Sequence, residues 1–143
     1  MQWKKQVFHL IGQFIGMPIR NKNISHSIHC RQCWNDTWEA CEEWLNKYTN
    51  SVVGLTPLVT YSNVNDLLHV VKKLPMDKLV LETDAPYFIP RGGPDSLLGH
   101  LNRKFSLPPH VANVAAKVAM VKQCEVKDVL TASRDNIRRI YKV

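Results

Sequence analysis

The stretch that decides the fold of this chain is Leu79-Val-Leu-Glu-Thr-Asp-Ala-Pro-Tyr-Phe-Ile-Pro-Arg91. It opens with the apolar run of residues 79–81, the pattern of a short strand buried on both faces, as parallel strands are. Glu82 and Asp84 follow, two positions apart. Because side chains alternate along a strand, both carboxylates are expected to point to the same side. Pro86 cannot donate to a sheet ladder, so the strand is expected to end there.

The position of these two carboxylates indicates chemistry rather than packing. In α/β proteins, ligands and catalytic groups lie at the carboxyl ends of buried parallel strands. Carboxylates buried there without a partner would be strongly destabilising, so a cation is expected beside Glu82 and Asp84. A metal ion is the natural candidate.

Residues 82–90 closely resemble the signature of the TatD-type metal-dependent deoxyribonucleases, a family of amidohydrolase-like TIM barrels. Residues 54–61 resemble the preceding barrel strand of that family, residues 74–79 the Pro-led entry to the signature strand, and residues 136–141 its terminal helix. The resemblance implies an α/β fold with parallel strands and outer helices. A complete (β/α)8 barrel needs roughly 250 residues. We therefore expect residues 1–143 to form a single partial domain, the C-terminal part of a TIM barrel, with the barrel incomplete in this chain.

Hydrophobic periodicity predicts strands that alternate with helices, the pattern of a parallel sheet. Besides the signature strand, strands are expected at residues 24–30 and 51–55. The predicted helices are an amphipathic one near the N-terminus, one capped by Asp36, one that starts at Asn63 or Asn65, one that starts at Ser106 or Pro108, a short one at residues 125–131 and a final one at residues 133–141.

The resemblance also implies roles for the site residues. Asp84 would help to hold a divalent cation (Mg2+, Mn2+ or Zn2+) and would activate the attacking water, while Glu82 would orient a ligand or a basic side chain. His29 would be a second metal ligand, because the family places a metal-binding His followed by Cys at the ends of two barrel strands. Arg31 fits the earlier of these motifs, whereas the order along the chain fits the later one, and both remain open. His26 matches no motif and is not expected to bind metal.

Several ligands of the family are missing from the sequence. The family opens with a His-x-Asp or His-x-His pair and later adds a bridging Glu, and neither is found here. Asp84 and one His cannot complete a two-metal site, because each ion needs four or more donors. A competing interpretation groups His29, Cys30, Cys33 and Cys41 as a zinc site. Its Cys-x-x-Cys spacing suits zinc, but a second closely spaced pair is absent, and Cys41 also fits a buried helix face.

Charge favours a polyanionic partner. The formal net charge is +7, which suits nucleic acid. On a barrel, the loop that carries Arg91, His100, Arg103 and Lys104 would lie at the catalytic face, and Arg91 is expected to contact a phosphate of DNA or another phosphodiester. No apolar stretch is long enough to cross a membrane, and reduced cysteines suit an intracellular protein, cytoplasmic or nuclear.

Three functions therefore remain under consideration: a TatD-like deoxyribonuclease, an inactive fragment, and a nucleic-acid-binding remnant without catalysis. Whether the chain is an enzyme stays open, because the signature favours hydrolysis and the ligand count opposes it. Unpaired strand edges at residues 24–30 and beyond residues 79–84 predict marginal stability and self-association.

Overall fold

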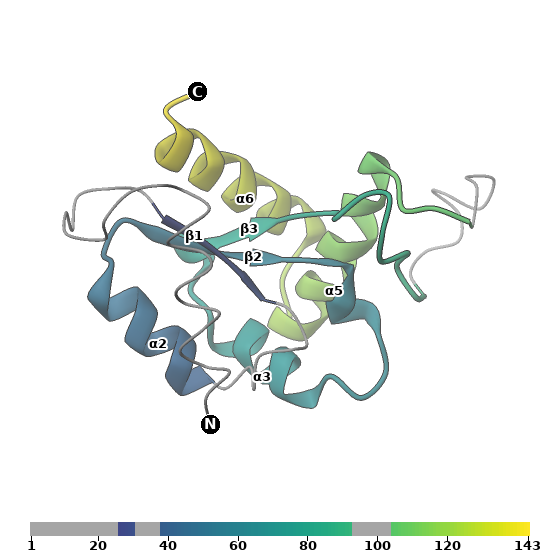
Figure 1. Ribbon diagram of the computed structural model, residues 1–143, viewed down its shortest axis with the longest axis horizontal. Helices are drawn as coiled ribbons and strands as arrows, with labels where there is room; N and C mark the ends of the chain where they lie inside the picture. Colours follow the sequence, from purple (N-terminus) through teal and green to yellow (C-terminus); the bar gives the residue numbers. More distant parts are fainter. Residues whose placement is uncertain (1–25, 31–37, 93–103) are drawn as a thin grey trace.

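A computed structural model describes residues 26–30, 38–92 and 104–143 of the chain. Three parallel strands, β1 (His26–Cys30), β2 (Ser51–Leu55) and β3 (Leu79–Leu81), form one sheet in the order β1-β2-β3 (Figure 1). In the register of the sheet, His29 pairs with Gly54, and Gly54 pairs with Val80. The predicted α/β fold with parallel strands is confirmed, and the described strands do not close a barrel.

The signature strand is shorter than the sequence predicts. It ends at Leu81 rather than at Pro86, although the Glu82 amide still donates to Leu55 O at 3.0 Å. Asp84 has a φ of 47°, a left-handed conformation that aspartate tolerates in turns. The rule of alternating side chains therefore stops before Asp84, and its relation to Glu82 is set by the turn instead.

Helices and strands alternate along the described chain, as predicted. Four α-helices and three short 3-10 helices lie in the described ranges: α2 (Trp38–Lys47), η1 (Pro57–Thr60), α3 (Asn65–Lys73), η2 (Met76–Lys78), η3 (Pro108–His110), α5 (Val111–Lys122) and α6 (Val126–Tyr141). None of the helices in this part of the chain combines the length and the apolar character needed to cross a membrane.

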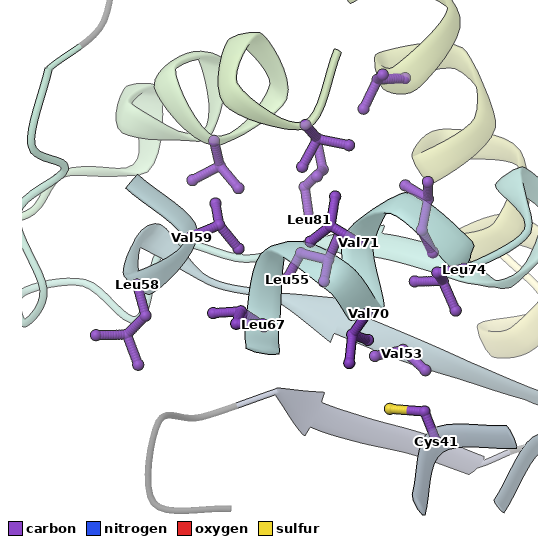
Figure 2. Close-up of a cluster of buried hydrophobic side chains, with 14 of the residues drawn as sticks. Cys41, Val53, Leu55, Leu58, Val59, Leu67, Val70, Val71, Leu74 and Leu81 are labelled. Atoms are coloured by element: carbon purple, nitrogen blue, oxygen red, sulfur yellow. The ribbon is translucent and has the colours of Figure 1, made fainter. Parts of the chain in front are cut away.

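The main core lies between one face of the sheet and helices α2, α3 and α5. Figure 2 shows Leu55 of β2 close to Leu67 and Val71 of α3, and Val53 close to Val70; the two strand residues are fully buried. Burying one such side chain stabilises a fold by roughly 1.5–3 kcal/mol. Cys41 of α2 belongs to the same core and is 3% exposed, which agrees with an apolar role rather than with the zinc interpretation.

Helix α6 lies against the outer edge of β3, and one prediction is wrong here. The Leu81 amide donates to Ser133 Oγ at 3.0 Å, and Asn136 Nδ2 donates to the carbonyls of Leu79 and Met76, each at 2.8 Å. Among the described residues no strand pairs with this edge of β3, as predicted, but side chains of α6 give partners to two of its backbone groups. The sequence predicted two helices here, one at residues 125–131 and a second that starts at Ser133. In the structure α6 is continuous and Ser133 lies within it. Its hydroxyl serves the strand instead of capping a helix.

The opposite face of the sheet packs against the same helix. Val52 of β2 and Val80 of β3 form a small buried cluster with Ile140, and Ile137 packs against it. In Figure 1, α6 runs along β3 on the side of the sheet away from α2 and α3. The predicted N-terminal helix, the Asp36 cap and the side chains of residues 26–37 lie outside the described part, as do His100 and Arg103.

Candidate functional site

The carboxyl ends of the three strands meet at one edge of the sheet, because all three run parallel. His29 is the penultimate residue of β1, and Glu82 and Asp84 follow β3. The residues predicted to bind metal thus come from the same end of the sheet, with β2 between their strands. Because the side chain of His29 is outside the described part, its convergence with Asp84 stays a prediction.

Gly54 provides the space that the Glu82 side chain occupies. A Cβ atom placed on Gly54 would lie 2.1 Å from Glu82 Oε1 and 2.6 Å from Glu82 Cδ, so the carboxylate lies directly over this backbone position. Because Gly54 is also the register partner of His29, the Glu82 carboxylate lies beside the strand position that carries His29. Sequence reasoning missed this role for Gly54, although a glycine inside a strand often marks the close approach of another group.

The turn that carries Asp84 is held by hydrogen bonds on both sides. The Tyr87 amide donates to Asp84 O at 2.8 Å, and one carboxylate oxygen, Asp84 Oδ2, is buried. Ser106 amide donates to Pro86 O at 2.9 Å, and Ser106 Oγ donates to Thr83 O at 3.2 Å. The segment that enters α5 therefore fixes the signature turn from outside the sheet.

The donor types suit a divalent cation, but the described residues do not complete its coordination shell. Carboxylate oxygens bind Mg2+ and Mn2+, and an imidazole nitrogen adds affinity for Zn2+ and Mn2+. Within residues 38–92 and 104–143, no three His, Cys, Asp or Glu side chains are placed to hold one ion. Asp84 and Glu82 are carboxylates that follow β3 in this part, and a complete coordination shell would need further donors from outside it.

A groove of about 750 Å3 lies next to the signature turn. We call it the aromatic groove, and it is lined by Tyr61, Pro86, Tyr87, Phe88, Ile89, Pro90, Arg91, Lys104 and Phe105. Two of these side chains are cationic and none is a carboxylate. The Arg91 guanidinium lies over the Tyr61 ring, with Cζ 4.4 Å from the ring centroid, a cation–π contact that holds the charge in place.

The aromatic side chains of this groove were not identified as site residues from the sequence. Tyr87 is 71% exposed and Phe105 is 54% exposed. The available signal was the interleaving of aromatic residues with Arg91 and Lys104, a pattern typical of surfaces that bind nucleic acid. Arg91 itself was predicted as a phosphate contact, and the structure places it on the groove wall.

Comparison with known proteins agrees with this architecture. A family model described as TatD related DNase matches residues 17–142. The chain belongs to the TatD-related DNase family. Membership confirms the resemblance that residues 82–90 suggested.

Curated relatives include nucleases and hydrolases. The chain is 31% identical over 116 residues to the human "3'-5' RNA nuclease TATDN2", a match that covers 81% of this chain and 14% of the relative. It is 27% identical over 111 residues to the "uncharacterized metal-dependent hydrolase YabD" of Bacillus subtilis, covering 78% of this chain and 40% of the relative. The chain thus spans less than half the length of either relative.

Solved structures share the fold. YJJV, a TatD homologue from Escherichia coli K12, superposes with a TM-score of 0.63 at 22% identity, over 82% of this chain and 40% of that one. An uncharacterized amidohydrolase from Saccharomyces cerevisiae gives a TM-score of 0.65 at 16% identity, over 84% of this chain and 41% of that one. The described sheet and helices therefore correspond to part of the TIM barrel of the family.

Proposed function

We propose that this chain carries part of the site of a metal-dependent nuclease that hydrolyses phosphodiester bonds in DNA or RNA. The observation that carries the proposal is the place of Asp84. This signature carboxylate follows the buried parallel strand β3. Pro86, two residues further on, lines the aromatic groove, whose described lining residues include two cations and no carboxylate. A polyanionic substrate in that groove would bring a phosphate toward the strand ends.

The chain's own residues divide the work. Asp84 would be a metal ligand and would accept a proton from the attacking water. His29 would be the second ligand, Glu82 would orient a ligand or a basic side chain, and Arg91 would contact a substrate phosphate. A divalent cation supplies, when bound, polarisation of a phosphoryl oxygen. Mg2+, Mn2+ and Zn2+ are the cations to test.

The alternative function is nucleic-acid binding without cleavage. It is favoured by the donor count, because the described residues offer two strand-end carboxylates and no cluster of three potential ligands. For either function we propose an intracellular location, cytoplasmic or nuclear, where free thiols such as Cys41 and Cys124 persist.

Oligonucleotide hydrolysis with Mg2+ or Mn2+ tests the proposal, first with the chain alone and then with the chain joined to the part of YabD that the match does not cover. The chain alone should cleave little, because its ligand set is short. The joined protein should cleave, and Asp84→Asn should reduce its rate by at least about 100-fold, more than the roughly 10–100-fold loss for an outer-shell partner.

The matched control is Asp77→Asn, which makes the same change at an exposed carboxylate on η2 and should leave the rate unchanged. Cleavage that survives Asp84→Asn would remove Asp84 from the mechanism. A joined, folded protein that binds the oligonucleotide but does not cleave it would support the non-catalytic alternative.

A further inference from the structure

We propose that the aromatic groove is a base-stacking subsite, in which Tyr87 and Phe105 hold unpaired bases next to the phosphate under attack. This inference rests on the proposed function and adds how the substrate is recognised: through the faces of its bases as well as through its phosphates. It predicts that a nucleic acid with accessible bases binds better than one that presents only its backbone.

Exposure is the first argument. Tyr87 and Phe105 leave 71% and 54% of their surfaces in solvent, although large aromatic side chains normally stabilise a protein by being buried. They belong to separate segments of the chain and yet line the same groove. Exposed aromatic rings that share a groove mark a surface for a ligand with flat apolar faces.

Rigidity is the second argument, because a stacking platform must already be in place to gain affinity. Tyr61 Oη donates to Ile89 O at 3.0 Å, and the Arg91 amide donates to Thr60 Oγ1 at 2.8 Å. On the other wall, the Ser106 amide donates to Pro86 O. The residues adjacent to Tyr87 and Phe105 are therefore tied to each other, and both rings start from fixed backbone.

Charge and size select the ligand. Among the described lining residues Arg91 and Lys104 are cationic and none is a carboxylate, so an anionic ligand is favoured over a neutral apolar one. The volume of about 750 Å3 lies within the roughly 300–1,000 Å3 of small-molecule sites, a size that suits a nucleotide. Aromatic faces together with cations suit alternating bases and phosphates, the combination seen in sites for single-stranded nucleic acid.

The test measures binding without hydrolysis. Fluorescence anisotropy in EDTA would compare a labelled oligothymidylate with an abasic chain of equal length, using the 143-residue protein. Tyr87→Leu and Phe105→Leu keep apolar bulk but remove the ring, and each should weaken oligothymidylate binding roughly tenfold, the loss of one stacked base. Abasic binding should not change. Tyr87→Phe keeps the ring and should bind as the unaltered protein does.

Tyr141→Leu is the matched control, because Tyr141 is 59% exposed on α6 and does not line the groove. Equal affinity for the two probes, or unchanged oligothymidylate binding by both leucine variants, would overturn the subsite. As a second readout, the fluorescence that Phe105→Trp adds to that of the unaltered protein should be quenched by oligothymidylate and not by the abasic chain. Since EDTA removes metal, failure of cleavage would leave these binding differences intact and would contradict only the proposed function.

Discussion

At position 54 of β2, the missing side chain leaves room for a carboxylate. A Cβ on Gly54 would lie 2.1 Å from Glu82 Oε1, so Gly54→Ala should force the Glu82 side chain to move. Overpacking typically destabilises by 1–3 kcal/mol, and because the obstructing atom ends a flexible side chain we expect about 1 kcal/mol. With Glu82→Ala already present, Gly54→Ala should be neutral or slightly stabilising. Alanine reduces the conformational entropy of the unfolded chain, which stabilises a protein by about 0.4–1 kcal/mol.

Urea unfolding of the four proteins in this double-mutant cycle measures the coupling between Gly54 and Glu82. A Gly54→Ala cost that is the same in both backgrounds would show that the carboxylate does not lie over Gly54. The pair also shows a limit of sequence reasoning. The pattern of residues 79–86 identified the strand and its two carboxylates. Which residue of β2 lies beneath the Glu82 side chain depends on the strand register, and the local sequence pattern does not determine that register.

At the level of the elements, α6 supplies side-chain hydrogen bonds to the open edge of β3. Ser133→Ala would leave the buried Leu81 amide without its acceptor, and Asn136→Ala would remove the donor to Leu79 O and Met76 O. Each change should destabilise the fold by about 1–3 kcal/mol, the cost of an unsatisfied buried polar group. For Ser133→Ala, the better helix propensity of alanine offsets about 0.5 kcal/mol of that loss.

Arg134→Ala on the same helix is the control, because its ion pair with Asp135 is exposed, with side chains 59% and 56% accessible, and such pairs contribute little. Chemical denaturation should place it within about 0.5 kcal/mol of the unaltered protein. If Ser133→Ala and Asn136→Ala lower the free energy of unfolding by as little as this control does, water hydrogen-bonds the backbone groups at the β3 edge as well as the α6 side chains do. The sequence resemblance drew attention to Asn136, but only tertiary contacts explain why α6 continues through Ser133, a residue type that also caps helices.

At the level of the whole molecule, the structure has the class of fold that the sequence predicts, but it contains a groove and contacts at a strand edge that the sequence did not predict. The sequence predicted a strand at residues 51–55 and a helix that starts at Asn63 or Asn65, and the structure has β2 and α3 there, because these segments bury local apolar patterns that depend little on distant residues. The aromatic groove was not predicted, since it joins Tyr61, the signature turn and Phe105, and such convergence depends on how loops pack. Both β1 and β3 are edge strands of the described sheet, and α6 supplies side-chain hydrogen bonds to the edge of β3.

The state of the isolated chain follows from that sheet. Among the described residues no strand lies beyond β1, and an unpaired strand edge is open to association with other chains. The family fold is larger than this chain, which covers 40% of YJJV. We therefore expect the 143-residue protein to show concentration-dependent association in sedimentation velocity and a broad thermal transition. Joined to the part of YabD that the match does not cover, it should sediment as a monomer and melt cooperatively, because β1 then gains a neighbour. A monodisperse monomer with a sharp melt from the isolated chain would show that residues outside the described part already protect β1, and would make the added strands unnecessary for folding.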